Sequence, residues 1–153
     1  MVSPSRQEAN HSALAPSKMD DYREYIREYN EISKVPNGDY NLIAKYYHPD
    51  MDVCAQGHVF KGRNAMLESL KLAHDGVTER MDIIHLAHDG NKILVEIDAV
   101  LKANRDIPDY IVGPLKKDEE AVYRILTSYD LDPDTKTVKK LIVLWPTLGS
   151  KGL

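Results

Sequence analysis

The chain has 153 residues, of which 42% are hydrophobic and 29% charged, and its formal net charge at pH 7 is −4. This length fits one globular domain, and the mildly acidic balance excludes the basic surface that binding to nucleic acid or an anionic membrane requires. The single cysteine, Cys54, excludes an internal disulfide, and no window approaches the run of about 18 apolar residues that could span a bilayer.

The two ends of the chain differ in composition from its middle. Residues 1–18 are rich in Ser, Pro and Ala, show no periodicity and lack the apolar core of a signal peptide. We therefore predict a mobile N-terminal arm over residues 1–18, one domain over residues 19–146, a tail over residues 147–153, and a cytoplasmic location.

The first half of the domain carries the patterns of three helices. A first helix is predicted from a cap at Ser17 to about Ser33, because its tyrosines and Ile26 recur with helical spacing. The next elements in the chain are a short helix at residues 40–47, two short strands at 51–55 and 58–60, and a third helix at 63–74.

The second half carries the patterns of four long strands in two hairpins. Residues 81–103 alternate apolar and polar side chains about a turn at Asp89-Gly90-Asn91, and a second hairpin joins residues 120–131 to 137–145. An ordered loop or lid is expected between them, at residues 104–119. Helices first and antiparallel strands after them predict an α+β fold, with three helices packed on one face of a curved antiparallel sheet.

Several stretches resemble a known superfamily. They are the helix YREYIREYN, the segments NLIAKYYHPDMDV and FKGRNAMLESL, the strand pair IIHLAHDGNKILVEIDAVL, and the last strand ending in LIVLWP. The chain resembles the nuclear transport factor two-like superfamily and, within it, the SnoaL-like group of small cyclases, isomerases and dehydratases. This resemblance implies a cone-shaped pocket for a small apolar molecule, no cofactor, and a homodimer formed through the outer face of the sheet.

The resemblance carries over only in part at the level of single residues. Tyr25 matches the first-helix tyrosine of the ketosteroid isomerases, but the two acids of those enzymes fall at Ala55 and Ile125. The tyrosine and aspartate of the scytalone dehydratases fall at Tyr29 and Asn30, and their two histidines have no counterpart at the matching strand positions.

His85 is the first candidate for proton transfer, because an imidazole titrates near neutral pH. A turn with an odd number of residues, such as Asp89-Gly90-Asn91, would place His85 on the inner face with Met81, Ile83 and Ala87. A turn of two residues would place it outside, as a surface histidine.

Aromatic and histidine side chains supply the other site candidates. Tyr25 and Tyr29 lie one helical turn apart, so both hydroxyls could point at one ligand oxygen, or both rings could simply pack on the sheet. The predicted ligand-contacting residues are His58, Tyr47, Tyr123 and Trp145.

The sequence contains no metal-binding spacing and no glycine-rich phosphate or dinucleotide motif. The main hypothesis is therefore a cofactor-free cyclase, isomerase or dehydratase acting by proton transfer on a small oxygenated metabolite, as in secondary metabolism. One alternative is a non-catalytic binding or dimerisation module of the same fold. Another is an epoxide-opening hydrolase, which would need a cluster of Asp, Asn and Arg.

Overall fold

The computed structural model describes residue 19 and residues 21–146, so the predicted arm (1–18) and tail (147–153) lie outside the described residues. The helices are α2 (Tyr22–Ser33), the 3-10 helix η1 (Tyr40–Tyr46) and α3 (Arg63–Ala73). The strands are β1 (Tyr47–Ala55), β2 (His58–Lys61), β3 (Val77–Asp89), β4 (Lys92–Ala103), β5 (Glu120–Leu131) and β6 (Val138–Leu144).

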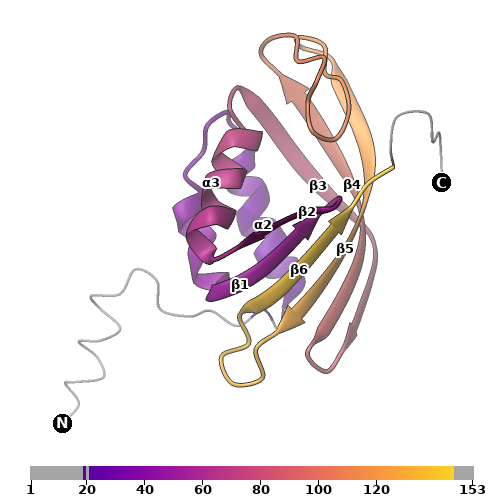
Figure 1. Cartoon of the computed structure of the whole chain (residues 1–153). Coiled ribbons are helices and arrows are strands. Elements are labelled where there is room, and N and C mark those ends of the chain that lie inside the picture. Colours follow the sequence, from indigo (N-terminus) through magenta and orange to yellow (C-terminus); the bar gives the residue numbers. More distant parts are fainter. Residues whose placement is uncertain (1–18, 20, 147–153) are drawn as a thin grey trace.

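The six strands form one curved sheet in the order β2-β1-β6-β5-β4-β3. Neighbouring strands are antiparallel except β1 and β6, which run parallel. Figure 1 shows the helices on the concave side of this sheet, and the chain crosses from β4 to β5 through the orange loop at one end. The predicted α+β class, with helices on one face of a curved antiparallel sheet, is confirmed.

Helix α2 starts at a polar cap and is fastened to the sheet. The Asp21 carboxylate accepts hydrogen bonds from the backbone N–H groups of Arg23 and Glu24, which would otherwise have no partner. Near its other end, the Asn30 side chain accepts from the Met81 N–H (2.8 Å) and donates to the Met81 carbonyl (3.0 Å). These two bonds fix α2 against β3.

The region around Tyr47 differs from the prediction. The second helix is a 3-10 helix that ends at Tyr46, and β1 begins at Tyr47 and not at Met51. Tyr47 already pairs with Val138 of β6, and the pairing is irregular between Tyr47 and Asp52. Pro49 lies in this irregular stretch, where its missing N–H costs no ladder hydrogen bond.

The hairpin of β3 and β4 closes through a turn of two residues. Asp89 pairs with Lys92, and Gly90 has a φ of 60°, as the first central residue of a type II′ turn requires. Farther from the turn, toward the N-terminal end of β3, the register with β4 shifts between Ile83 and His85, so Ile84 is an extra, bulged residue. The bulge inverts the alternation, so side chains on its two sides follow different phases.

The core lies between the helices and the concave face, and a smaller apolar cluster of Val77, Leu101, Ala103 and Leu115 lies under the loop of residues 104–119. This loop is ordered: Ile107 and Leu115 exchange both backbone hydrogen bonds, and the Tyr110 hydroxyl donates to the Ala73 carbonyl (2.7 Å). Among the described residues, no helix has the length and apolar character needed to cross a membrane.

Candidate functional site

A cavity of about 210 Å³ lies between the helices and the concave face of the sheet. Most of its lining is apolar. The lining includes six Tyr, Phe and Trp side chains, Tyr25, Tyr29, Phe60, Tyr110, Tyr129 and Trp145, and the other side chains with polar atoms are His58, Ser69, His74, Glu79 and Thr127. A cavity of this kind, apolar with a few convergent polar groups, is typical of a small-molecule site.

Three polar side chains meet in the wall of this cavity. Glu79 Oε1 accepts a hydrogen bond from the Tyr29 hydroxyl (2.7 Å) and lies 2.8 Å from His74 Nε2. The Tyr29 hydroxyl is also 3.3 Å from His74 Nε2. All three residues are buried, with Glu79 8% exposed and His74 2% exposed. A buried carboxylate with charge-assisted hydrogen bonds is stable only because its partners are in place.

A short connection brings His74 and Glu79 together. His74 follows the last residue of α3, Gly76 turns the chain with a φ of 74°, and Glu79 is on the inner face of β3 two residues after the strand begins. Asn37 holds this connection: its side chain donates to Asp75 (3.1 Å) and accepts from the Gly76 N–H (3.1 Å). The pair of His74 and Glu79, called the dyad below, is therefore held in place by a residue outside the cavity.

The neighbours of His74 fix its tautomer. His74 Nδ1 lies 2.7 Å from the Leu70 carbonyl oxygen, which can only accept, so Nδ1 carries a hydrogen. Nε2 faces a carboxylate oxygen, and one proton must lie between the two atoms for this contact to be favourable. The dyad is then either imidazolium with carboxylate or imidazole with carboxylic acid, and its net charge is zero in both forms.

The second oxygen of Glu79 differs from the first. Among the described residues, no protein group donates a hydrogen bond to Oε2, although Glu79 lines the cavity. Oε2 is therefore the oxygen of this carboxyl group that a ligand in the cavity could reach. In the imidazolium form of the dyad, Oε2 is a base in a largely apolar site.

Burial keeps the nearby phenols neutral. Loss of solvent raises the pKa of Tyr25 and of Tyr29 well above the ordinary value for tyrosine, and the Glu79 carboxylate raises that of Tyr29 further. Both side chains are hydrogen-bond donors at neutral pH. Within the part of the chain that the structure describes, no group of three or more His, Cys, Asp or Glu could hold a metal ion.

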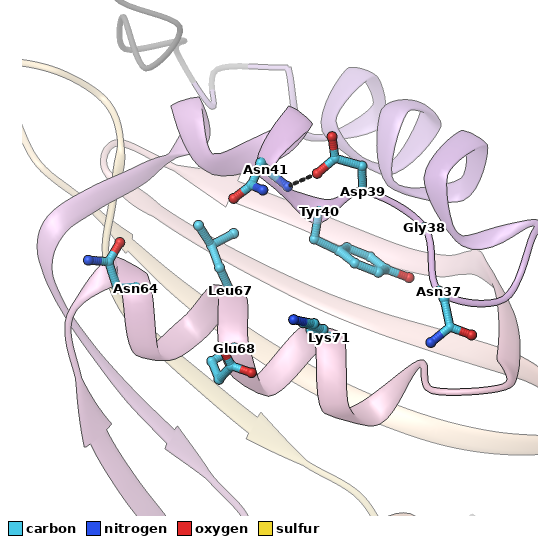
Figure 2. A pocket seen from close by; sticks show the side chains of 9 residues that line it. All are labelled: Asn37, Gly38, Asp39, Tyr40, Asn41, Asn64, Leu67, Glu68 and Lys71. Atoms are coloured by element: carbon cyan, nitrogen blue, oxygen red, sulfur yellow. Dashed lines mark hydrogen bonds between the residues drawn. The ribbon is translucent and has the colours of Figure 1, made fainter.

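A second hollow, of about 420 Å³, lies on the surface between η1 and α3 (Figure 2). It is lined by Asn37, Gly38, Asp39, Tyr40, Asn41, Asn64, Leu67, Glu68 and Lys71. Its charged side chains are exposed, and only Tyr40 is buried: its ring packs against that of His74 with 4.6 Å between ring centres and a tilt of 34° between the ring planes. This hollow is larger but solvated, so the buried dyad on the other side of Tyr40 is the better place for chemistry.

The comparisons with solved structures cover most of the chain. A proposed SnoaL-like polyketide cyclase from Shewanella denitrificans OS-217 matches with a TM-score of 0.61 and 16% identity, over 94% of this chain and 92% of that one. An NTF2-like protein of unknown function from Cytophaga hutchinsonii ATCC 33406 matches with a TM-score of 0.57 and 11% identity, over 86% and 91%. The chain has the NTF2-like fold. This confirms the predicted resemblance at the level of the fold.

Other comparisons add little about activity. An LEH-like epoxide hydrolase from M. tuberculosis matches with a TM-score of 0.57 and 14% identity, over 81% of this chain and 84% of that one. Neither a family model nor a curated protein matches the sequence. Because the NTF2-like fold hosts several chemistries, function must be argued from the residues of the site.

The NTF2-like cavity contains some of the predicted site residues. Tyr25 and Tyr29 line its wall, and His58 and Trp145 lie where it adjoins a hollow under the loop of residues 104–119. Tyr47 is buried behind this wall, with its hydroxyl 2.6 Å from that of Tyr25. The cavity lining thus includes Tyr25, Tyr29, His58 and Trp145 but not Tyr47.

Two predicted residues lie elsewhere. The Tyr123 hydroxyl donates to the Pro114 carbonyl (2.9 Å), so its ring packs under the loop and is not part of the cavity lining. His85 lies on the outer face of the sheet: its side chain is 81% exposed and its Nδ1 is 3.0 Å from Glu96. The two-residue turn causes this, because it sets His85 opposite Glu96 on the outer face, and the inward orientation that a three-residue turn would give His85 is not found.

His74 and Glu79 are not among the site residues predicted from the sequence. The predicted hairpin began at residue 81, so Glu79 fell in no element, and His74 was treated as the last residue of a helix. A signal for Glu79 exists, because Val77, Glu79, Met81 and Ile83 share one phase of β3. An acidic residue on an otherwise apolar strand face predicts a buried carboxyl group that is hydrogen-bonded to other polar side chains.

Proposed function

We propose that this protein is an enzyme that transfers a proton on a small, largely apolar, oxygenated molecule without a cofactor, as cyclases, isomerases and dehydratases do. The observation that carries the proposal is Glu79, a buried carboxyl group that lines the cavity and whose Oε1 is held by Tyr29 and His74, while Oε2 accepts no hydrogen bond from the described residues. The likeness in fold to proposed polyketide cyclases supports it by analogy only.

In the proposed reaction Glu79 is the general base. Oε2 takes a proton from a carbon next to a ligand carbonyl, and the electron pair of the broken C–H bond moves into the carbonyl, which becomes an enolate. His74 and Tyr29 keep their hydrogen bonds to Oε1 and so hold the carboxyl group in place. Return of the proton to a different carbon completes an isomerisation. In a cyclisation the enolate carbon forms a bond to a second carbonyl carbon of the same ligand, and the proton goes to the oxygen of that carbonyl. In a dehydration the C–O bond of a β-hydroxyl breaks as the enolate collapses, and the proton leaves with the hydroxyl as water.

Tyr25 is the proposed partner of the ligand oxygen. Its hydroxyl lies 2.6 Å from that of Tyr47, and either hydroxyl can be the donor in this pair. When Tyr47 donates, the Tyr25 O–H is available to the cavity and can donate to the oxygen on which negative charge develops. Tyr47 would then act through Tyr25, as a positioning residue.

Proton exchange tests this proposal without knowledge of the natural substrate. The probe is 2-tetralone, an uncharged ketone with acidic C–H groups, whose exchange for deuterium in D2O can be followed by proton NMR. Calorimetry first confirms that the probe binds. Glu79→Gln should lower the protein-catalysed exchange rate by about 10²-fold or more, because the amide is not a base.

The matched control is Glu120→Gln, which makes the same change at an exposed residue at the start of β5. It should leave the exchange rate at the wild-type value. Equal exchange in the Glu79 variant and the wild type would contradict the role of Glu79. If the probe binds but no variant or wild-type protein accelerates exchange, the alternative of a non-catalytic binding module is favoured.

The epoxide-opening alternative finds less support in the cavity. That chemistry needs Asp, Asn and Arg together, and the described cavity lining includes none of these residue types. The structural likeness to an LEH-like epoxide hydrolase shows a shared fold only.

A homodimer through the outer face of the sheet is a further part of the proposal. That face exposes Leu94, Val122, Leu126 and Leu144 around an ionic network of Arg124 with Glu96 and Asp98. Apolar side chains beside charges of both signs suit a self-complementary contact between two copies. The cytoplasmic location stays a prediction of the sequence, as does a role in secondary metabolism.

A further inference from the structure

We infer that the cavity selects an uncharged ligand over an anion of the same size, so that the substrate is a neutral ketone, ester, lactone or phenol and not a carboxylate or phosphate. This inference rests on the proposed function, because it names the class of molecule on which Glu79 acts. Three features of the described residues support it, one each in the wall, the dyad and the mouth.

The wall contains no fixed positive charge. None of the described residues that line the cavity is Lys or Arg. The imidazole of His74 is the only lining group besides the exposed His58 that could be cationic, and its Nε2 is already engaged by Glu79 at 2.8 Å. An anion entering this cavity would lose its water and gain no ionic partner, which is costly in an apolar site.

The positive and negative charges within the dyad of His74 and Glu79 cancel each other. Since Nδ1 of His74 donates to Leu70, one proton shared between Nε2 and Oε1 gives the pair zero net charge. It therefore offers no compensating charge to an anion, and none to a cation. Its unengaged group is Glu79 Oε2, which can accept a hydrogen bond or a proton from a neutral ligand but repels a second carboxylate.

The mouth of the cavity, where it opens into the adjoining hollow, also lacks a fixed positive charge among the described residues. The adjoining hollow is lined by Gln56, His58, Trp145 and residues 108–114, and among these described residues the one with a fixed charge is Asp109. The Gln56 side chain donates a hydrogen bond to the Trp145 carbonyl (2.8 Å) and accepts one from the Trp145 N–H (3.0 Å), so both of its polar atoms already have a partner. An approaching anion thus passes a carboxylate before it reaches a second one.

Isothermal titration calorimetry at pH 7 with three naphthalene probes tests the inference. The probes are 2-naphthol, which is uncharged, 2-naphthoate, which is an anion, and 2-(aminomethyl)naphthalene, which is a cation. The naphthol should bind at least about tenfold more tightly than either charged probe, which is about 1.4 kcal/mol. Naphthoate binding as tight as naphthol binding overturns the inference, and so does tighter binding of the cation, because the dyad would then be net negative.

A charge added at the rim gives an independent check. Ile111 lines both the cavity and the mouth and is 54% exposed, so the structure tolerates a long polar side chain there. Ile111→Lys should raise the affinity for naphthoate about tenfold relative to the matched uncharged variant Ile111→Gln. If the two variants bind naphthoate equally, the missing cation does not set the selectivity and the inference fails.

The inference and the proposed function fail in different ways. If naphthoate competes equally while Glu79→Gln still abolishes proton exchange, Glu79 is the base and only the ligand class is wrong. If the charge preference holds while Glu79→Gln exchanges protons as fast as the wild type, the cavity selects neutral ligands but the acid-base role is wrong.

Discussion

At the scale of single residues, the core depends on phenols that are paired with one another. Tyr22 and Tyr129 share a hydrogen bond of 2.8 Å, and Tyr25 and Tyr47 share one of 2.6 Å. Desolvation raises the pKa of each, that of Tyr129 to about 12 and those of Tyr22, Tyr25 and Tyr47 well above the ordinary value for tyrosine. Because each hydroxyl has a partner, tyrosine can fill positions where an unpaired polar atom would be costly.

These pKa shifts predict a loss of stability in alkali. In the unfolded chain tyrosine ionises near pH 10, whereas the buried phenols keep their protons to higher pH, so rising pH favours the unfolded state. Stability should be complete below about pH 10 and then fall by about 1.4 kcal/mol per pH unit for each such phenol. Urea denaturation at a series of pH values, with circular dichroism as the signal, measures this slope.

Ultraviolet absorbance supplies the control for this titration. Phenolate absorbance from the buried tyrosines should rise only together with the loss of circular dichroism. If all nine tyrosines of the chain ionise while the protein is still folded, the phenols are not shielded as described.

At the scale of elements, the position of α2 on the sheet decides where Tyr29 meets Glu79. Asn30 forms both of its bonds with the backbone of Met81, so one side chain joins α2 to the middle of β3. On the other side, Asn37 and Gly76 shape the passage from α3 into β3. The dyad therefore depends on two contacts between elements as much as on its own residues.

Asn30→Asp should destabilise the protein. The substitution keeps the size and the acceptor but replaces the amide donor with an oxygen that faces the Met81 carbonyl, so one bond becomes a repulsion. We expect a loss of about 1–3 kcal/mol in the free energy of unfolding, measured by urea denaturation near neutral pH.

The control for Asn30 is Asn64→Asp at an exposed position in the first turn of α3. An added negative charge near a helix N-terminus is mildly favourable, so this variant should change stability by less than about 1 kcal/mol. Equal effects of the two substitutions would mean that the bonds of Asn30 to β3 contribute nothing.

At the scale of the whole molecule, the sheet has one face for the cavity and one that is open. Leu126 lies at the centre of the open face, between Glu96 on β4 and Leu144 on β6. A monomer would leave these apolar side chains in water, whereas a two-fold dimer would cover them.

Native mass spectrometry at micromolar concentration should therefore show a dimer. Leu126→Lys should convert it to a monomer, because two lysines would be buried near the two-fold axis. Leu72→Lys is the matched control, since Leu72 is 70% exposed but lies on α3, away from this face. A wild-type monomer would refute the proposed dimer, and loss of the dimer in the control would refute this choice of face.

The sequence by itself determined the class of the fold and much of its outline. Glu120–Leu131 is a strand with the predicted bounds, and the third helix and the final hairpin lie within a residue or two of the prediction. Alternation, helical spacing and turn residues are local signals, and they predict local structure well. Tyr25 and Tyr29 on α2, His58 on β2 and Trp145 directly after β6 line the cavity because these predicted elements form its wall.

Only the tertiary structure decided which side chains meet. One residue of turn length at Gly90 places His85 outside, and one bulged residue at Ile84 returns Ile83 and Glu79 to the inner face; both depend on how β3 pairs with β4. Glu79 and Tyr29 lie 50 residues apart in the chain and are joined by the packing of α2 on β3. Alternation along a strand fixes relative faces but not which face is buried, because burial depends on what the rest of the chain packs against it.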